Sequence, residues 1–158
     1  YVVFGTDAPW PASIELAGLG STTGFLLDGV DPTGIAGFSV ARAGDLDQDG
    51  IDDLVVGASG TGDNAGTAYV VFGSTTPFPA PRSLGSLDGS NGFSLTGDDP
   101  GAFAGRSVAG GGDLDHDGIA DLVIGAPALE GPDPTQPGST YVIFGGDPGL
   151  LFRDGFEH

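Results

Sequence analysis

The sequence predicts an all-β fold, and three observations support this. Valine, isoleucine, phenylalanine and tyrosine cluster in short runs bounded by Gly, Pro, Asp and Asn, which is typical of short β-strands. Apolar residues do not recur at the helical period of about 3.6 residues, so amphipathic helices are not expected. A long segment also occurs twice, which indicates that one supersecondary unit is used more than once.

The repeat aligns without a gap. Residues 24–59 match residues 92–127 at an offset of 68. The pentapeptide Tyr-Val-Val-Phe-Gly begins at Tyr1 and again at Tyr69, and Tyr-Val-Ile-Phe-Gly begins at Tyr141. The same short apolar segment, a candidate strand, therefore recurs three times along the chain.

Strands are expected within each unit. The first unit supplies strands at 38–43, 54–58, 68–72 and 93–96, and the second at 106–109, 122–125 and 140–144. The run Leu-Val-Val-Gly-Ala, beginning at Leu54, is continuously apolar, as in a strand covered on both faces. Asn91-Gly92 indicates a turn before the fourth strand, and the Pro- and Ser-rich stretch 74–86 indicates a surface loop.

Four short antiparallel strands per repeat predict blades of a β-propeller. A single blade cannot bury both faces and must stack on neighbouring blades. A β-sandwich or an elongated β-solenoid is the alternative, but the constant offset favours the propeller. The expected organisation has four parts: strands 3 and 4 of a preceding blade at 1–36, a complete blade at 37–97, a last blade at 98–145 and a C-terminal tail at 146–158.

Composition excludes several classes of function. The formal net charge is −18, from 22 acidic and 4 basic residues, so nucleic acid is not an expected partner. No apolar run approaches the roughly 18 residues needed to cross a bilayer. The chain has no cysteine, so it has no disulfide framework.

Two acidic loops carry the expected chemistry. Each loop, numbered from its first aspartate, has carboxylates at positions 1, 3, 5 and 9 and a glycine at position 6. The backbone carbonyl at position 7 can turn inward. Ca²⁺ prefers oxygen ligands of these kinds, and the glycine permits the bend that brings them together. The glycines are Gly50 and Gly118. The predicted ligands are Asp45, Asp47, Asp49, the carbonyl of Ile51 and Asp53 in the first loop, and Asp113, Asp115, Asp117, the carbonyl of Ile119 and Asp121 in the second.

Other interpretations of these loops are weaker. An EF-hand needs a glutamate at position 12, where this chain has Val56 and Ile124, and it needs flanking helices. Magnesium prefers few protein ligands and keeps its waters. Solvated acidic turns remain the plain alternative, since Asp and Gly are common in turns, but two copies in register disfavour them.

These residues resemble FG-GAP repeats, the calcium-binding blades of integrin α-subunit propellers and of many bacterial secreted or surface proteins. The resemblance rests on GRSVAGGGDLDHDGIADLVIGAP followed by STYVIFG, and on the earlier copy from Gly37, and extends over about residues 1–145. It implies a propeller of about seven blades, with calcium bound between the first two strands of a blade by the same ten positions. The Phe-Gly pair of the family is loosened here to Ile35-Ala36-Gly37 and Phe103-Ala104-Gly105.

No catalytic residues are predicted. Ser39 and Ser107 lie in strands without a nearby His or Cys in the sequence, and His116 occupies a loop position where the first copy has Gln48. A saturated calcium site leaves no open position for activating a substrate. The chain is therefore expected to be no enzyme by itself.

The function expected is that of a calcium-stabilised extracellular adhesion or binding module, secreted or on the surface of a bacterium. Its partner would be an unknown protein or glycan, or other copies of itself. One alternative is a subunit of a homo-oligomeric ring or filament built by strand pairing between copies, and another is a non-catalytic part of a larger secreted enzyme. Because the chain starts within a repeat, it is expected to be the C-terminal part of a longer propeller, with the tail 150–158 as a sorting signal or a frayed end.

Overall fold

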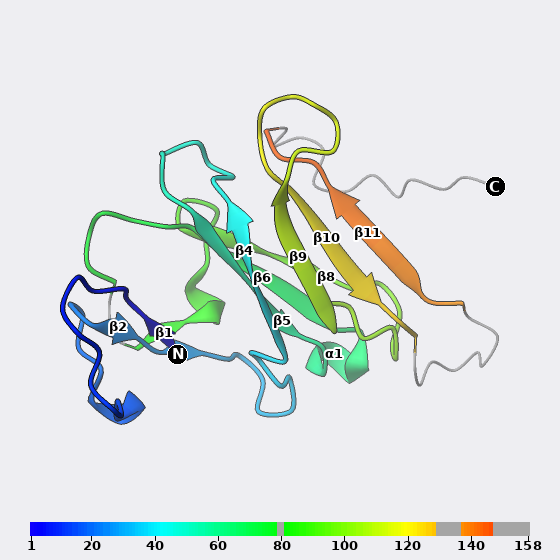
Figure 1. Ribbon diagram of the computed structural model, residues 1–158. Coiled ribbons are helices and arrows are strands. Elements are labelled where there is room, and N and C mark those ends of the chain that lie inside the picture. Colours follow the sequence, from blue (N-terminus) through cyan, green and yellow to red (C-terminus); the bar gives the residue numbers. More distant parts are fainter. Residues whose placement is uncertain (79–80, 129–136, 147–158) are drawn as a thin grey trace.

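The computed structural model describes residues 1–78, 81–128 and 137–146. Two antiparallel sheets lie side by side, and the first strand of one is next to the first strand of the other (Figure 1). Two short strand pairs near the N-terminus flank the first sheet (Figure 1). The all-β prediction is confirmed, and the sheets are blades of the propeller type.

The first sheet has four strands, which run in the order β4 (Ser39–Gly44), β5 (Asp53–Ala58), β6 (Thr67–Val71) and β8 (Gly92–Thr96). Each neighbouring pair is antiparallel. All four strands lie within two residues of their predicted positions. β5 is buried along almost its whole length, as its continuous apolar run predicts.

The second sheet has three strands in the described part of the chain. They are β9 (Ser107–Gly112), β10 (Asp121–Ala126) and β11 (Ser139–Ile143), and β10 lies in the middle. The registers repeat: Ser39 pairs with Gly57 in the first sheet, and Ser107 pairs with Gly125 in the second. The sequence repeat is therefore also a structural repeat.

The N-terminal part supplies the remaining elements. β1 (Val2–Val3) pairs antiparallel with β2 (Gly24–Phe25), in the register that β6 and β8 repeat 68 residues later. β3 (Leu27–Asp28) pairs parallel with β7 (Arg82–Ser83). Three short helical turns complete the part of the chain that the structure describes: η1 (Leu16–Gly18), α1 (Thr61–Asn64) and η2 (Leu84–Ser86). None of the helices among the described residues has the length and apolar character that a bilayer crossing requires.

The prediction of a plain surface loop at 74–86 is partly wrong. Arg82 and Ser83 form β7, and Arg82 and Leu84 are buried. The guanidinium of Arg82 lies over the ring of Phe78 and donates to the carbonyl oxygen of Asn91 at 2.9 Å. The proline and serine content predicted an exposed loop. The tertiary packing of one apolar and one basic side chain instead buries part of the segment and pairs it as a strand.

The main core lies between the two sheets. Val55 and Val70 of the first sheet and Leu122 and Ile124 of the second form one cluster and are almost completely buried. The opposite face of the first sheet is covered by the chain's own Leu84. Each blade therefore depends on a neighbouring segment for its burial, as expected for stacked blades.

The two blades approach so closely that side chains are excluded at the contact. A Cβ atom on Gly110 of β9 would lie 2.8 Å from the Cα of Ala43 and 2.9 Å from the carbonyl oxygen of Arg42. Two residues along the same strand, a Cβ on Gly112 would meet nothing within 4 Å. The backbones of β4 and β9 thus pack against each other through Gly110.

Gly110→Val should lower the free energy of unfolding by about 1–3 kcal/mol, because the extra carbons overpack the contact between blades. Gly112→Val is the matched control in the same strand and should change stability by less than about 0.5 kcal/mol. Urea unfolding followed by circular dichroism measures both. Equal losses in the two variants would show that β4 and β9 do not pack as described.

Candidate metal centre

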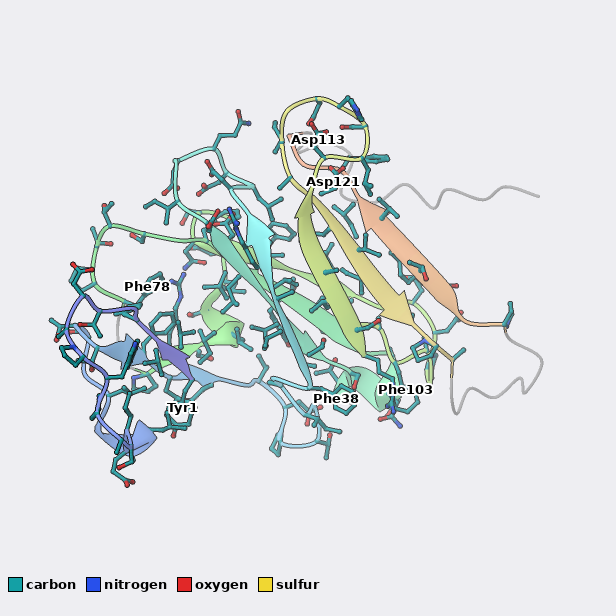
Figure 2. The ribbon with its side chains drawn as sticks, in the orientation of Figure 1. Tyr1, Phe38, Phe78, Phe103, Asp113 and Asp121 are labelled. Carbon is teal, nitrogen blue, oxygen red and sulfur yellow. The ribbon has the colours of Figure 1, made fainter. Side chains whose placement is uncertain are left out.

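Both acidic loops lie at the same end of their blades. The first joins β4 to β5 and the second joins β9 to β10, so each connects the first two strands of a blade. Figure 2 shows Asp113 in the second loop and Asp121 at the start of the strand that follows it. Phe38 and Phe103 lie at the opposite end of the sheets in the same view.

Each loop brings three of its predicted ligands together. One carboxylate oxygen from each of the three residues lies within 4.8 Å of the other two, and this holds in both loops. The groups are Asp45, Asp47 and Asp49 in the first loop and Asp113, Asp115 and Asp117 in the second. Like charges gathered this closely repel one another, and a divalent cation bound among them would remove that repulsion.

The backbone of each loop holds the carboxylates in place. The amide of Gly50 donates to Asp45 Oδ2 at 2.9 Å, and the amide of Ile51 donates to Asp49 Oδ1 at 2.8 Å. In the second loop Gly118 and Ile119 donate to Asp113 Oδ2 at 3.1 Å and to Asp117 Oδ1 at 2.8 Å. The same internal bonds therefore shape both loops.

The glycine at position 6 has the left-handed conformation that the sequence predicts. Gly50 has φ of 88° and Gly118 has φ of 90°. Position 4 is left-handed as well, with φ of 62° at Gln48 and 66° at His116. Both of these side chains are exposed, so position 4 serves the turn of the backbone.

One oxygen of the first loop has no protein partner. Among the described residues, Asp45 Oδ1 is a buried side-chain oxygen without a hydrogen bond. A buried carboxylate oxygen that lacks a donor is costly unless a cation or another donor compensates it. The all-oxygen donor set and this orphaned atom fit a hard cation such as Ca²⁺.

The aspartate at position 9 lies differently from the other three. Asp53 is 3% exposed and Asp121 is 2% exposed, and neither belongs to the group of three converging carboxylates. Asp53 Oδ2 accepts from the amide of Leu46 at 2.8 Å, and Asp53 Oδ1 accepts from the amide of Gly73 at 2.8 Å. This carboxylate therefore ties the loop to the end of β6.

The second loop repeats this arrangement. Asp121 accepts from the amides of Leu114 and Gly145. Each carboxylate oxygen retains a second lone pair after accepting one hydrogen bond. A role of Asp53 and Asp121 as metal ligands is therefore compatible with their position and stays a prediction.

Burial raises the pKa of Asp53, because an apolar setting disfavours the charged form. The hydrogen bonds from Gly73 and Leu46 act in the opposite direction, and the negative charges of Asp47 and Asp45 add to the increase. A bound cation would relieve both unfavourable effects. The buried carboxylate thus has an electrostatic reason to lie beside a metal.

The two glycines whose amides donate to Asp53 and Asp121 were not predicted from the sequence. Gly73 and Gly145 supply the amides, and a Cβ at Gly73 would lie 2.6 Å from the Cγ2 of Ile51. The signal was present, because Gly ends all three copies of the pentapeptide that begins at Tyr1, Tyr69 and Tyr141. Ile51 and Ile119 pack their side chains on these glycines, while the role of their carbonyls as ligands stays a prediction.

Comparison with known proteins agrees with this geometry. A family model described as FG-GAP repeat matches residues 36–71 and 104–143. The chain is an FG-GAP repeat protein. The two matched segments begin 68 residues apart, which is the offset of the sequence repeat, and each contains one acidic loop with its two flanking strands.

Curated relatives belong to two groups of proteins. Integrin alpha-5 of Xenopus laevis is 36% identical over 106 residues, covering 67% of this chain and 10% of the relative. Phosphatidylinositol-glycan-specific phospholipase D of Rattus norvegicus is 36% identical over 116 residues, covering 71% of this chain and 13% of the relative. Integrin alpha-M of Mus musculus is 34% identical over 98 residues, covering 60% of this chain and 8% of the relative. The chain thus spans about a tenth of the length of these relatives.

Asp53→Asn should destabilise the protein even in the presence of a chelator. The two backbone N–H groups reach different oxygens of Asp53, and in asparagine one of these becomes an NH₂ group that cannot accept. One buried donor is then left without a partner, at a cost of about 1–3 kcal/mol. Chemical denaturation in EDTA measures this effect without any contribution from metal.

The neighbouring Asp52→Asn is the control. Asp52 is exposed, and its ion pair with Arg42 at 2.6 Å is a surface pair worth about 0.2–1 kcal/mol. If Asp53→Asn lowered the free energy of unfolding no more than this control, the hydrogen bonds of Asp53 between the loop and the end of β6 would not contribute to stability.

Proposed function

We propose that this chain is a calcium-stabilised β-propeller segment that acts outside the cell as a non-catalytic adhesion or binding module. The observation that carries the proposal is the pair of acidic loops in register, each with three converging carboxylates. The buried, unpartnered Oδ1 of Asp45 adds a position that a cation would fill. FG-GAP repeats in both halves of the chain and similarity to integrin α-subunits support the same assignment.

The chain's own residues define what a bound ion would do. Asp45 directly follows β4 and Asp53 begins β5, so an ion held by the loop connects the ends of two neighbouring strands. Ca²⁺ supplies positive charge and takes six to eight oxygen ligands without a strict geometry. The hydrogen bond from the amide of Gly73 to Asp53 extends this connection to the end of the third strand. The role of the site is therefore to hold a blade together.

The proposed module is non-catalytic. Ser39 is engaged in packing, since its Oγ donates to the carbonyl oxygen of Gly105 in the neighbouring blade at 2.8 Å. His116 is exposed and serves a left-handed turn of the second loop. Neither residue lies in a nucleophile and base arrangement among the described residues.

An extracellular setting, in a bacterium as the resemblance implies, is part of the proposal. Extracellular calcium modules bind with dissociation constants of about 10⁻⁴–10⁻³ M, so such sites fill outside a cell. The net charge of −18 favours solubility and opposes binding to nucleic acid. The partner would be a protein or a glycan.

A second candidate is a non-catalytic part of a larger secreted enzyme. The observation that favours it is the similarity to phosphatidylinositol-glycan-specific phospholipase D from several mammals, of which the chain covers 13–14%. The two candidates share the calcium sites and differ in what is attached to them. Pull-down of a glycan or protein partner by this chain alone favours the binding module.

Isothermal titration with CaCl₂ should reveal two sites, and calcium should raise thermal stability. At a free calcium concentration about 100 times the dissociation constant, each site adds about 2.7 kcal/mol to the free energy of unfolding. Asp49→Ala and Asp117→Ala should each remove one site and lower the melting temperature in calcium far more than in EDTA.

Asp98→Ala is the charge-matched control, because Asp98 is exposed and lies outside both loops. It should leave both sites intact. Equal shifts of the Asp49 and Asp117 variants in calcium and in EDTA would refute the calcium sites, and so would stronger stabilisation by Mg²⁺ than by Ca²⁺.

A further inference from the structure

The contact between the two blades has two sides, which we name by the direction of its backbone amide hydrogen bonds: a donating half, which supplies the N–H groups, and a receiving half, which supplies the carbonyl oxygens. The donating half is the segment Gly101, Ala102, Phe103, Ala104 and Gly105, which belongs to the second blade. Its amides of Phe103 and Ala104 donate to the carbonyl oxygens of Asn64 at 2.8 Å and Ala65 at 2.9 Å in the first blade. Four of the five residues are buried by this contact, all except Phe103.

The receiving half is a small set of residues on the first blade. Ser39 Oγ donates to the carbonyl oxygen of Gly105 at 2.8 Å, and Gly66 forms a bridge with Ala104. A Cβ on Gly105 would lie 2.6 Å from the carbonyl oxygen of Thr67, and the carbonyl of Gly105 lies where a Cβ on Gly57 would be. Small residues and one hydroxyl therefore define the receiving surface.

The second blade carries a corresponding receiving surface, and within the described part of the chain no segment is bound to it in this way. The equivalents of Ser39 and Gly57 at the offset of 68 are Ser107 and Gly125. The equivalents of Gly66 and Thr67 are Gly138 and Ser139, because Thr67 pairs with Ala58 as Ser139 pairs with Ala126.

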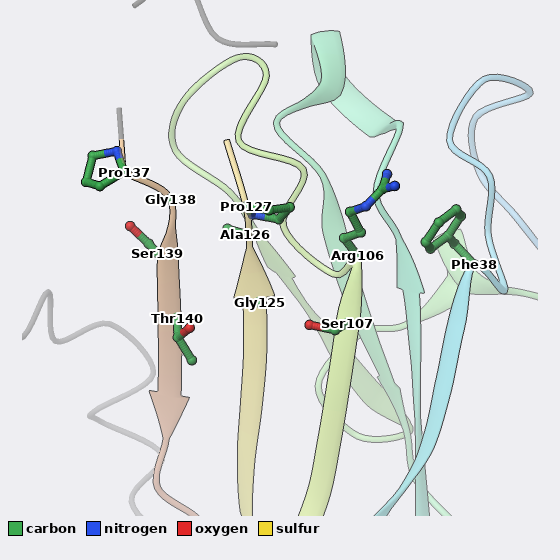
Figure 3. A pocket seen from close by; sticks show the side chains of 10 residues that line it. All are labelled: Phe38, Arg106, Ser107, Gly125, Ala126, Pro127, Pro137, Gly138, Ser139 and Thr140. Carbon is green, nitrogen blue, oxygen red and sulfur yellow. The ribbon is translucent and has the colours of Figure 1, made fainter. Parts of the chain in front are cut away.

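All four of these equivalents line one open groove with a volume of about 640 Å³. Figure 3 shows the groove across the ends of β9, β10 and β11, with Arg106 beside Phe38 at its edge. Gly57, Gly66 and Thr67 are buried, whereas Ser139 and Ser107 are exposed.

The first blade carries the matching donating segment, which is exposed except at Gly34. Residues 33–37 are equivalent to 101–105 and have the same local conformation: φ is 54° at Ile35 and 58° at Phe103, and the amide of Phe38 donates to the carbonyl of Ile35 as that of Arg106 does to Phe103, both at 3.1 Å. Among the described residues, the backbone amides of Ile35 and Ala36 lack the two hydrogen bonds that the amides of Phe103 and Ala104 make to the neighbouring blade. Ile35 is 56% exposed and Phe38 is 47% exposed.

We propose that the groove of Ser107, Gly125, Gly138 and Ser139 binds the segment 33–38 of a second copy of this chain, head to tail. The conformation of the segment is that of the contact already formed within one chain. Three of the four receiving residues are identical in the two blades, and the fourth is Thr67 in the first and Ser139 in the second. Ser107 Oγ would donate to the carbonyl of the second copy's Gly37, as Ser39 does to Gly105.

An aromatic and a basic residue complete the match. Within the chain, the guanidinium of Arg106 lies 4.9 Å from the ring centroid of Phe38. The repeat offset places Phe38 of a second copy on the other side of the same Arg106. Cation–π contacts with two aromatic rings favour Arg over Lys at such a position.

Docking has one steric requirement. β1 and β11 are the same strand of the repeat, so β1 of the second copy and β11 of the first would compete for one place. β1 is held by a ladder of two residue pairs and β11 by a ladder of five. β1 is therefore the strand that yields.

Mixed cross-linking tests the proposal in a chain without native cysteine. The variant Arg106→Cys is mixed with the variant Phe38→Cys at high protein concentration and treated with a short bis-maleimide. A heterodimer should form in several-fold higher yield than when Phe38→Cys is mixed with Ser94→Cys, whose residue is exposed on β8 away from the groove. A yield equal to that control overturns the proposal.

A competing peptide identifies the groove as the site. The synthetic peptide Asp-Pro-Gly-Ala-Phe-Ala-Gly-Arg, the sequence of residues 99–106, should abolish the heterodimer, whereas a scrambled peptide should not. Calcium binding measured on the same samples is independent of this outcome, so failure of docking and failure of the calcium sites are distinguishable. A heterodimer that persists with excess peptide also overturns the proposal, because another surface would then hold the copies.

Discussion

The negative charge gathered between the first two strands of each blade is the constraint on which the rest of the structure depends. Three carboxylates converge in each loop, and the fourth, Asp53 or Asp121, is buried beside them. Backbone amides compensate part of this charge, and they come from the loop and from the glycine just after the third strand. The charged loop therefore orders three strands of the blade.

The two ends of the blades have different roles. The end with the acidic loops gathers carboxylates whose charge the backbone amides compensate only in part, while the opposite end is joined by close backbone contacts that only small residues permit. Gly57 and Gly66 admit the backbone of residues 104 and 105, and Ser39 adds one hydrogen bond. Each blade thus needs a neighbouring repeat for its burial, and the proposed cation would neutralise the carboxylates at its other end.

Much of the fold and of the site was predictable from the sequence, because strand runs, turn residues and loop ligands are local features. The strands of both blades follow from short apolar runs bounded by turn residues, and the left-handed Gly50 follows from its position in the acidic loop. The hydrogen bond between Gly73 and Asp53 was not predicted, since it joins residues 20 apart in the sequence through a backbone amide. The burial of Arg82 was not predicted either, because it depends on Phe78 and on the parallel pairing of β3 with β7. Of the predicted tail at 146–158, residues 147–158 lie outside the described residues.

Anomalous X-ray diffraction from crystals grown in calcium tests the central claim most directly. Two ions should appear, one in each acidic loop, with carboxylate oxygens of Asp45, Asp47 and Asp49 at about 2.3–2.6 Å from the first and those of the equivalent residues around the second. The same map would decide whether Asp53 and Asp121 complete the coordination. Loops that keep the conformation described above in saturating calcium, with no ion among their carboxylates, would contradict the account.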